Sequence, residues 1–413
     1  MLPLLLLTAT LACPQDAPPP AVQSLAVTGG LVWTGAAFEP RTLYVQDGLF
    51  VADRPATVDR EVDATGRWVL PPLAEAHSHR FATSWDSASS RLDFLRSGAL
   101  YVANLCNPRD SREQCRGEVG GATGIDVLFT NGGLTGTGGH PVRLYEELHV
   151  GVYKQPHETF WEQNNDSTFF IVDDEEDLAA KWPLVLAGKP DLIKTLLSSS
   201  EEYELRRDDE RYYGSKGLDP GLLPAIVERA RAAGLRVATH VDTAADFRHA
   251  LAARVDLVVH TPGYGARSEE DWERYALTEA DARLARELGL VHVTTSSLAS
   301  RDAGRKLMKH NLGLLKAAGV KLAIGSDQWD DALAREREAL VALELFEPAE
   351  LVRVWCEDTP RALFPDRRIG RLEPGCEGSL ILLGGDPLAD PAHLGDVELV
   401  AKRGLVLWEA SRD

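Results

Sequence analysis

Residues 235–263 read LRVATHVDTAADFRHALAARVDLVVHTPG. The stretch contains two apolar runs, 236–241 and 257–262, which carry His240 and His260 near their ends. These histidines lie 20 residues apart, a spacing that fits one strand followed by one helix. Short apolar runs without polar alternation are typical of strands buried on both faces. The stretch therefore predicts two neighbouring strands of a parallel sheet.

Similar apolar runs alternate with helical patterns along most of the chain. Residues 219–233 begin with Asp-Pro, keep apolar residues at helical spacing and end before a glycine. Helices are also expected over 302–318 and 331–345. Repeated strand–helix units predict an α/β fold, and eight of them predict a closed (β/α)8 barrel of the TIM type. The expected strands are 69–76, 99–105, 125–130, 191–197, 236–241, 257–262, 291–296 and 321–326.

Segments with a different pattern flank the predicted barrel. Residues 24–70 and 363–413 consist of short β-type runs separated by turn residues. They predict a small β-sandwich domain built from N- and C-terminal segments. The barrel domain is expected between them, at 71–362.

An insertion at 131–190 separates the third and fourth barrel strands. It is far longer than the usual loop of a strand–helix unit. It carries aromatic residues, including Phe160 and Trp161, and it follows a strand on the functional side of the barrel. We therefore expect it to form a cap over the barrel mouth that faces the substrate.

The chain begins with an apolar stretch, MLPLLLLTATLAC at 1–13, followed by a Pro-rich linker at 14–23. The stretch is too short for a membrane span, which needs about 20 apolar residues, and it predicts an export signal. Leu11 and Ala12 before Cys13 resemble the end of a bacterial lipoprotein signal. Cys13 is therefore a lipidation candidate, and a plain secretory signal is the alternative. We expect an exported protein that is periplasmic or anchored to the membrane through a lipid at Cys13.

The composition is that of an ordinary globular protein. The chain has 413 residues, of which 44% are hydrophobic and 26% are charged. Its 44 Lys and Arg residues against 63 Asp and Glu residues give a net charge of −19. This charge repels nucleic acid and anionic lipid, so we expect no nucleic-acid partner and no membrane contact beyond the lipid anchor. A small-molecule substrate is expected, and homo-oligomerisation is left open.

Beyond Cys13 the chain has four cysteines, at positions 106, 115, 356 and 376. Cysteines of an exported protein can oxidise, and only a short polar loop separates Cys106 from Cys115. These two are the disulfide candidates, with free thiols as the alternative. Neither close pair has the CxxC spacing of a zinc site.

Residue types that bind metals follow several of the predicted strands. His77 and His79 lie two positions apart at the end of the first barrel strand, so both imidazoles face the same, inward side. Barrel enzymes carry their active sites at this end of the strands. Imidazole and carboxylate ligands without thiolate suit zinc, and manganese or iron also fit them. Four further ligand-type residues occupy equivalent positions: Lys194, His240, His260 and Asp327.

These features resemble the amidohydrolase superfamily of metal-dependent barrel hydrolases, in its dipeptidase-like and imidazolonepropionase-like branch. The resemblance covers nearly the whole chain beyond the leader. The stretches that carry it are GRWVLPPLAEAHSH (66–79), PDLIKTL (190–196), residues 235–263, VKLAIGSD (320–327) and IGRLEPGCEGSLILLGGDPL (369–388).

The resemblance implies a complete set of metal ligands. In that family the first strand ends in His-x-His, a carboxylated lysine of the fourth strand bridges two metals, the fifth and sixth strands give one histidine each, and the eighth gives an aspartate. The implied cofactors are two divalent ions, expected to be Zn²⁺, and carbon dioxide as the source of the lysine carbamate. The roles carry over, in order, to His77, His79, Lys194, His240, His260 and Asp327.

Lys194 and Asp327 are the catalytic candidates. Two adjacent dications disfavour an ammonium, and a neutral amine can capture carbon dioxide to become an anionic bridging ligand. Two ions would also lower the pKa of the water between them and produce hydroxide, the nucleophile, near neutral pH. Asp327 would take its proton and pass it to the leaving nitrogen.

Three residues are candidates for substrate contacts. Arg80 directly follows the His-x-His pair, and it either anchors a substrate carboxylate or forms an ordinary salt bridge. GLTGTGGHP resembles the Gly-Gly-His loop of the dipeptidase-like branch, which makes His140 a candidate, with a surface loop histidine as the alternative. Tyr213 lies where that branch often has a tyrosine that polarises the scissile carbonyl. Two nearby tyrosines compete for this role: Tyr203 and Tyr212.

We therefore expect an exported binuclear metal-dependent hydrolase that cleaves an amide-type C–N bond in a dipeptide, an N-acyl amino acid or a cyclic amide. A phosphotriester or lactone hydrolase is the nearest alternative, because the same hydroxide can attack phosphorus or an ester. A binding lipoprotein that uses the barrel as a scaffold is the non-enzyme alternative. The fold alone does not settle the substrate.

Overall fold

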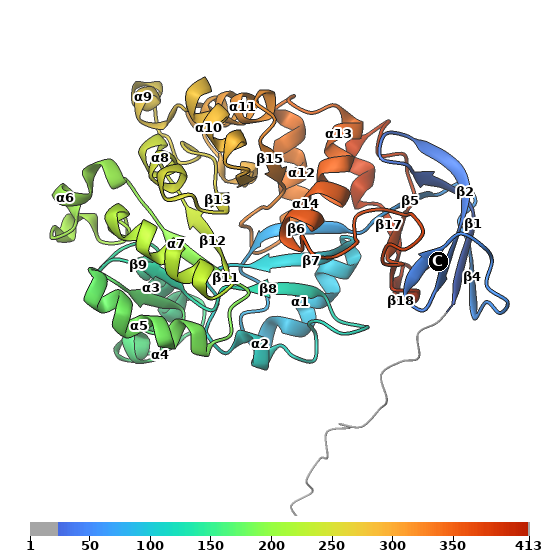
Figure 1. Ribbon diagram of the computed structural model, residues 1–413, viewed down its shortest axis with the longest axis horizontal. Coiled ribbons are helices and arrows are strands. Elements are labelled where there is room, and N and C mark those ends of the chain that lie inside the picture. The colour runs from blue at the N-terminus through green and yellow to red at the C-terminus, as the bar shows by residue number, and fades with distance from the viewer. Residues whose placement is uncertain (1–23, 412–413) are drawn as a thin grey trace, which may run out of the picture.

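The computed structural model describes residues 24–411, so the predicted signal at 1–13, the linker at 14–23 and the lipidation candidate Cys13 lie outside the described residues. The described chain has an α/β architecture in which parallel strands lie inside and helices surround them (Figure 1). In this part of the chain, none of the helices combines the length and the apolar character of a membrane span.

The parallel strands form two sheets. The larger has the order β10-β9-β11-β12-β13-β14-β15, and the smaller has the order β6-β7-β8. Each of the eight expected barrel strands overlaps a strand of these sheets, and the predicted insertion adds β9 and β10. Their bounds are β6 (Leu73–Ser78), β7 (Ala99–Asn104), β8 (Asp126–Phe129), β9 (Gly133–Thr135), β10 (Phe169–Ile171), β11 (Leu192–Leu196), β12 (Arg236–His240), β13 (Leu257–Val259), β14 (Val291–Val293) and β15 (Lys321–Ala323).

Backbone hydrogen bonds connect the two sheets at both edges. Ala76 N in β6 donates to Ile324 O, just after β15, at 2.9 Å. Asp191 N, just before β11, donates to the last carbonyl of β8 at 2.8 Å. Gly325 permits the first join, because a Cβ at this position would lie only 2.7 Å from His77 N. The strands therefore take a TIM-barrel-like arrangement.

The helices lie where the apolar periodicity predicts them. Before α7, the Asp219 side chain accepts a hydrogen bond from Gly221 N and caps the predicted helix start. The helices expected over 302–318 and 331–345 correspond to α11 and α12. The bounds are α1 (Ser84–Arg96), α2 (Ser111–Gln114), α3 (Val142–Gly151), α4 (Phe160–Asn164), α5 (Glu175–Ala187), α6 (Tyr203–Arg206), α7 (Leu223–Ala232), α8 (Ala244–Ala253), α9 (Trp272–Tyr275), α10 (Glu279–Glu287), α11 (Asp302–Ala317), α12 (Ala332–Ala342), α13 (Pro348–Arg353) and α14 (Thr359–Leu363).

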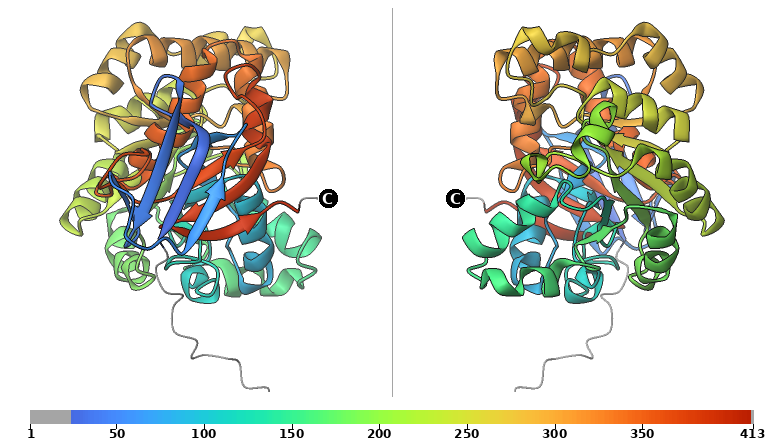
Figure 2. Two further views of the ribbon diagram at one scale, coloured as in Figure 1. Left: turned by 90° about the vertical axis from the view of Figure 1, so that its right-hand side faces the viewer. Right: turned by 90° about the vertical axis from the view of Figure 1, so that its left-hand side faces the viewer.

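The two ends of the described chain meet in a mixed sheet beside the barrel-like unit (Figure 2, left). Its order is β18-β17-β16-β5-β1-β2-β3, with β4 paired to β1. Strand β16 pairs with β5, so the C-terminal strands extend the N-terminal sheet. The described strands of this domain are therefore hydrogen-bonded into one sheet, whereas we expected a sandwich of two sheets. The bounds are β1 (Leu25–Trp33), β2 (Phe38–Gln46), β3 (Leu49–Val51), β4 (Arg60–Asp63), β5 (Trp68–Leu70), β16 (Leu380–Leu383), β17 (Val397–Lys402) and β18 (Leu405–Glu409).

The predicted disulfide between Cys106 and Cys115 does not form. All four cysteines within residues 24–411 are free and buried. The Cys115 thiol instead donates to two backbone carbonyls, those of Phe81 at 3.2 Å and Thr83 at 3.4 Å. Burial raises the pKa of both Cys106 and Cys115 to about 12, so both stay protonated thiols. The free-thiol alternative is the correct one.

Candidate active site

Three ligand-type side chains meet where the first and last of the expected barrel strands, β6 and β15, end. His77 belongs to β6, His79 directly follows that strand, and Asp327 lies just beyond β15. Asp327 Oδ1 lies 2.8 Å from His79 Nε2 and 3.6 Å from His77 Nε2. One ligand atom from each of the three residues lies within 4.8 Å of the other two, which is close enough to surround one metal ion.

Two more histidines extend this group. His240 is the last residue of β12, and His260 directly follows β13. The ring centroid of His260 lies 4.8 Å from that of His77 and 4.4 Å from that of His240. His260 Nε2 also lies 3.9 Å from Asp327 Oδ2. The four predicted histidine ligands and Asp327 therefore form one cluster.

The backbone turns into the left-handed region at two members of the cluster. The φ angle is 77° at His260 and 55° at Asp327. Residues other than glycine rarely adopt such φ angles. Backbone strain of this kind is found most often at functional sites. Asp327 is also held by its backbone, because its N–H donates to His77 O at 2.9 Å.

Lys194 lies in the middle of β11 and is 2% exposed. Its Nζ is buried and has no hydrogen-bond partner among the described residues. Burial lowers the pKa of Lys194 to about 8, although the Cys106 thiol and Asp327 act in the opposite direction. Its charge is near enough to lower the pKa of His77. A buried, unpartnered amine beside this cluster is what a metal-bridging carbamate would need as its precursor.

Asp327 is held in its anionic form. Burial opposes ionisation, but His77 and His79 outweigh it and lower the pKa of Asp327 below its usual range. Burial also lowers the pKa of His260 well below its usual value, so this imidazole is neutral. Neutral imidazoles around a carboxylate form a donor set that suits divalent transition metals.

Two carboxylates that the sequence analysis missed support the cluster. Glu75 accepts hydrogen bonds from His77 N at 2.9 Å and Ser326 N at 2.8 Å, and so ties β6 to the segment after β15. Asp242 Oδ1 lies 3.1 Å from His240 Nε2. Both stand two positions from a histidine ligand, so the strand periodicity that identified His77 and His79 could have identified them.

Tyr264 is a further residue that the sequence analysis did not find. Its ring centroid lies 5.2 Å from that of His260, and its hydroxyl donates to Asp242 at 2.6 Å. No spacing rule links Tyr264 to a strand end, so the sequence carries no signal for its position.

Of the three predicted substrate contacts, His140 is the one whose ring stacks on a histidine of the cluster. Its ring stacks on that of His240 at 4.6 Å, and burial lowers its pKa to about 3. The hydroxyl of Tyr213 donates to Glu146 at 2.9 Å, and its ring packs in a small core within the insertion. That core is built from Val142, Phe160 and Phe169.

Arg80 forms the salt bridge that was its alternative interpretation. Its guanidinium donates to Asp93 Oδ2 at 2.7 Å, to Trp329 O at 2.7 Å and to Ser90 Oγ at 3.0 Å. These contacts use three of the five N–H groups of the guanidinium, and the binding of a substrate carboxylate by Arg80 stays a prediction.

A cleft of about 900 Å³ opens beside His79. Its volume is that of a small-molecule site. The predicted insertion supplies one wall of the cleft through Tyr145, His149 and Tyr153, and Trp85 and Trp329 line other parts. The insertion therefore faces the space next to the cluster.

Arg109 also lines this cleft and is partly buried. Its guanidinium has no carboxylate partner within residues 24–411. Its stem packs over Gly188, where a Cβ would lie 2.7 Å from Arg109 Cγ. Arg109 is thus an unpaired cation in the cleft, in contrast to Arg80.

A family model described as the amidohydrolase family matches residues 194–407, just over half of the chain. The chain belongs to the amidohydrolase family. This amidohydrolase is a hydrolase that acts on carbon–nitrogen bonds. No curated protein sequence matches it.

Solved structures resemble this amidohydrolase over nearly its whole length. A prolidase in complex with N-methylphosphonate-L-proline has a TM-score of 0.69 at 18% identity, over 94% of this chain and 100% of that one. An Xaa-Pro dipeptidase with bound methionine has a TM-score of 0.70 at 17% identity, over 94% and 100%. The A. niger ochratoxinase has a TM-score of 0.67 at 19% identity, over 94% and 96%. At such identities the likeness establishes the TIM-barrel-like fold.

Proposed function

We propose that this amidohydrolase is a binuclear metal-dependent enzyme that hydrolyses the amide bond of a dipeptide, an N-acyl amino acid or a cyclic amide. One observation carries the proposal: the unpartnered, buried Nζ of Lys194 lies among ligand-type side chains from four other strands or strand ends. The names of the similar structures, among them a prolidase and a dipeptidase, agree with an amide substrate.

The two parallel sheets form one closed (β/α)8 barrel in this proposal. The hydrogen bonds at both sheet edges support closure, which would bring the ligand-bearing strand ends around one mouth. The domain boundaries proposed with it are 24–70 and 363–413 for the small β domain and 71–362 for the barrel.

The residues present fit two divalent ions. The neutral imidazoles, the Asp327 carboxylate and the Lys194 amine, once it has added carbon dioxide and lost a proton, offer nitrogen and oxygen donors without thiolate. Two bound ions, expected to be Zn²⁺, would polarise the amide carbonyl and lower the pKa of water. The proposed ligands are His77, His79, Lys194, His240, His260 and Asp327.

The protein side chains would move one proton during hydrolysis. Asp327, held as a carboxylate, accepts a proton from the attacking water and then donates it to the leaving nitrogen as the C–N bond breaks. Formation of the C–O bond and cleavage of the C–N bond give a carboxylic acid and an amine as products. His140, whose ring stacks on that of His240, is proposed to contact the substrate. Glu75 and Asp242 hold the ligands in position.

Two of the three proposed substrate classes, dipeptides and N-acyl amino acids, carry a free carboxylate, and Arg109 is the cation proposed to bind it. Arg109 lines the same cleft as His79 and forms no ion pair with a carboxylate in the described structure. A guanidinium binds a carboxylate through paired hydrogen bonds, which would orient the amide toward the cluster.

The test combines elemental analysis with a substrate panel. Protein purified without chelator should contain two divalent ions per chain and should hydrolyse members of a dipeptide and N-acyl amino acid panel. A metal content near zero in protein with intact side chains would refute the metal site. Turnover of phosphotriesters or lactones in the absence of amide hydrolysis would refute the substrate class.

We also propose that the protein is exported and that its mature form begins at or near Cys13, which the apolar leader and the Pro-rich linker support. Cell fractionation with N-terminal mass spectrometry is the test. An unprocessed Met1 in the cytosol of the native host would refute export.

A further inference from the structure

An apolar recess opens beside the cleft that His79 lines. It has a volume of about 430 Å³. Six residues line both the recess and the cleft: Ala82, Thr83, Trp85, Val152, Tyr153 and Trp329. The two spaces therefore adjoin, and one small molecule can occupy both of them.

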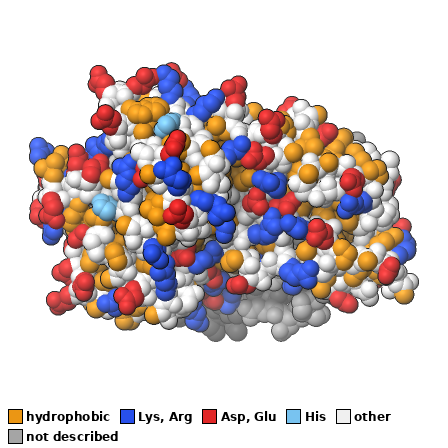
Figure 3. Space-filling model, turned by 45° about the horizontal axis from the view of Figure 1, so that its top comes forward, with side chains coloured by type: hydrophobic (Ala, Val, Ile, Leu, Met, Phe, Trp, Pro, Cys, Tyr) orange, Lys and Arg blue, Asp and Glu red, His pale blue; other side chains and the backbone are white. Residues whose placement is uncertain are grey.

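Large apolar side chains gather around the recess although they are exposed to solvent. Trp85 is 82% exposed, Val152 is 58% exposed, and Tyr153 and Trp329 are each 39% exposed. They come from three segments: the first turn of α1, the residues directly after α3 and the loop after β15. Figure 3 shows a different pattern on one face of the molecule, where hydrophobic side chains are scattered among charged ones. Exposed apolar side chains that gather in one place indicate a binding surface, whereas single ones need no explanation.

Polar contacts hold the backbone on two sides of the recess. Arg80 donates to Ser90 Oγ in α1 at 3.0 Å and to Trp329 O at 2.7 Å, and so joins the two segments that carry the tryptophans. Asp86 Oδ1 accepts a hydrogen bond from Thr83 N at 2.9 Å, which fixes the start of α1. These contacts leave the apolar side chains free to bind a ligand.

Trp329 connects the recess to the candidate active site. Its ring stacks on that of His79, with the centroids 5.6 Å apart and an angle of 23° between the planes. It also follows Asp327 by only two positions. A group that packs on the Trp329 ring in the recess therefore lies one side chain away from a proposed metal ligand. A small substrate whose amide bond lies at the cluster can reach this place.

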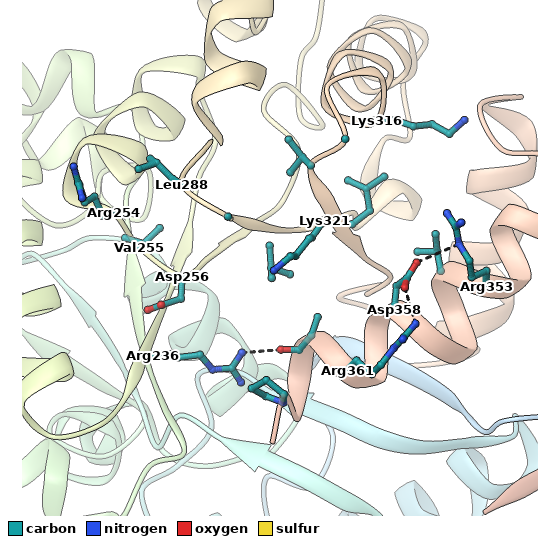
Figure 4. A pocket seen from close by; sticks show the side chains of 18 of the residues that line it. Arg236, Arg254, Val255, Asp256, Leu288, Lys316, Lys321, Arg353, Asp358 and Arg361 are labelled. Atoms are coloured by element: carbon teal, nitrogen blue, oxygen red, sulfur yellow. Dashed lines mark hydrogen bonds and ion pairs between the residues drawn. The ribbon is translucent and has the colours of Figure 1, made fainter. Parts of the chain in front are cut away.

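A further pocket, of about 960 Å³, lies at the opposite end of the parallel strands. Arg236 and Lys321, the first residues of β12 and β15, line it. Its charged side chains do not converge: Asp358 pairs with Arg361 at 2.9 Å, and Figure 4 shows Arg254 at the edge of the pocket, away from Lys321. This pocket therefore indicates no single ligand, in contrast to the apolar recess.

We propose that the recess binds an aromatic group of the substrate, so that this amidohydrolase acts on amides that carry an aromatic side chain. The proposal rests on the proposed function and specifies its substrate class. Aromatic rings pack on the rings of Trp and Tyr, and removal of apolar surface from water stabilises the complex. Arg109 lines the cleft but not the recess, so a substrate carboxylate and the aromatic group would bind in separate places.

The binding experiment uses probes that have no amide bond to hydrolyse. Naphthylacetate carries an aromatic group and a carboxylate, and acetate, the reference, carries the carboxylate alone. Ligand-observed NMR titration of the full chain, purified without chelator, gives both dissociation constants.

The test variant is Trp85→Ala with Val152→Ala. Its control is Leu284→Ala with Val341→Ala, which removes two exposed apolar side chains that line neither the recess nor the cleft. Trp85→Phe is the conservative variant, because it keeps an aromatic ring at this position.

We expect naphthylacetate to bind the wild type roughly tenfold or more tighter than acetate. The test variant should weaken naphthylacetate binding by roughly fivefold or more, because apolar contact area is lost, and the control should change it by less than about twofold. Trp85→Phe should keep most of the affinity. Equal affinities of the two probes for the wild type, or equal weakening in the test variant and the control, would overturn the proposal.

Turnover distinguishes a failure of this proposal from a failure of the proposed function. The value of kcat/KM should be higher for dipeptides with one Phe than for Ala-Ala, and the test variant should lower it more for the Phe dipeptides. Absence of all amide hydrolysis with tight naphthylacetate binding would refute the proposed function and support the aromatic recess. Equal kcat/KM for all dipeptides would overturn the recess alone. A dimer that dissociates in the test variant, seen by size-exclusion chromatography, would place a second copy of the chain in the recess and would also overturn the proposal.

Discussion

At the scale of single residues, Lys194 is the most informative side chain. Its neighbours Leu192 and Ile193 are buried, and its own Nζ has no partner in the described structure. A charged ammonium without a partner is expensive to bury, and burial lowers its pKa to about 8. This lower pKa makes a larger fraction of the amine neutral near pH 7 than in a free lysine, and the neutral amine is the form that can add carbon dioxide.

We predict that Lys194→Ala loses one or both metal ions and nearly all turnover. A short carboxylic acid added with excess metal should restore part of both, because it replaces the missing oxygens. Lys194→Arg should not restore either, since a guanidinium stays charged and cannot form a carbamate. Metal content and turnover are measured together. An unmodified amine in fully active enzyme, seen by carbon-13 spectroscopy with labelled bicarbonate, would contradict the carbamate.

Arg109 allows a second prediction at this scale. Arg109→Gln should raise KM for substrates with a free carboxylate by roughly 10- to 100-fold, the loss expected for charge-assisted hydrogen bonds. The same substrates capped as carboxamides should show little change. Steady-state kinetics on both series is the measurement. An equal effect on capped and uncapped substrates would contradict carboxylate recognition by Arg109.

At the scale of elements, the insertion at 131–190 is a small structural unit with its own core. Phe160 at the start of α4 is fully buried against Val142 and Phe169. Trp161 next to it is 44% exposed. The ring of Phe160 therefore holds the insertion together and does not face the cleft.

We predict opposite outcomes for the two aromatic residues. Phe160→Ala should lower the free energy of unfolding by about 3–5 kcal/mol, because it opens a cavity in a closed core. Trp161→Ala, the matched control, should cost less than about 1 kcal/mol, as is usual for exposed positions. Urea unfolding of both variants is the measurement. A smaller loss for Phe160→Ala than for Trp161→Ala would contradict this assignment.

At the scale of the whole molecule, Lys402 connects the small sheet to the barrel-like unit. It lies at the end of β17 and is 2% exposed. Its Nζ donates to Asp126 at 2.6 Å, and to the carbonyls of Gly124 at 2.7 Å and Gly121 at 2.9 Å. Asp126 begins β8, so this contact joins segments more than 270 residues apart.

We predict that Lys402→Met lowers the free energy of unfolding by about 3 kcal/mol, because it leaves buried acceptors without a donor. Arg60→Met is the control. Its ion pair with Glu409 also joins the two ends of the chain, but it is exposed and should contribute less than about 1 kcal/mol. Denaturant unfolding compares the two variants. Equal losses would show that the buried contact adds nothing beyond a surface pair.

Much of the fold and of the metal cluster is predictable because both depend on local periodicity. The apolar runs predicted a parallel strand at all eight expected positions, and the spacing of His77 and His79 placed both rings on one side of β6. The same rule applies to Asp242 beside His240, which we overlooked. Side chains alternate between the two faces of a strand with a period of two residues, and the carboxyl ends of parallel strands lie at the same edge of a sheet. Both rules can be applied to the sequence without knowledge of long-range contacts.

Long-range contacts determined the remaining features. The fold brings the guanidinium of Arg80 to the carbonyl of Trp329, 249 residues away, which no local pattern predicts. Arg109 became the unpaired cation of the cleft because the packing brings no carboxylate of the described chain into an ion pair with its guanidinium. Periodicity tells which side of a strand a residue occupies and where the strand ends. Which distant side chain then pairs with it, and which charge is left without a partner, depends on how the elements pack.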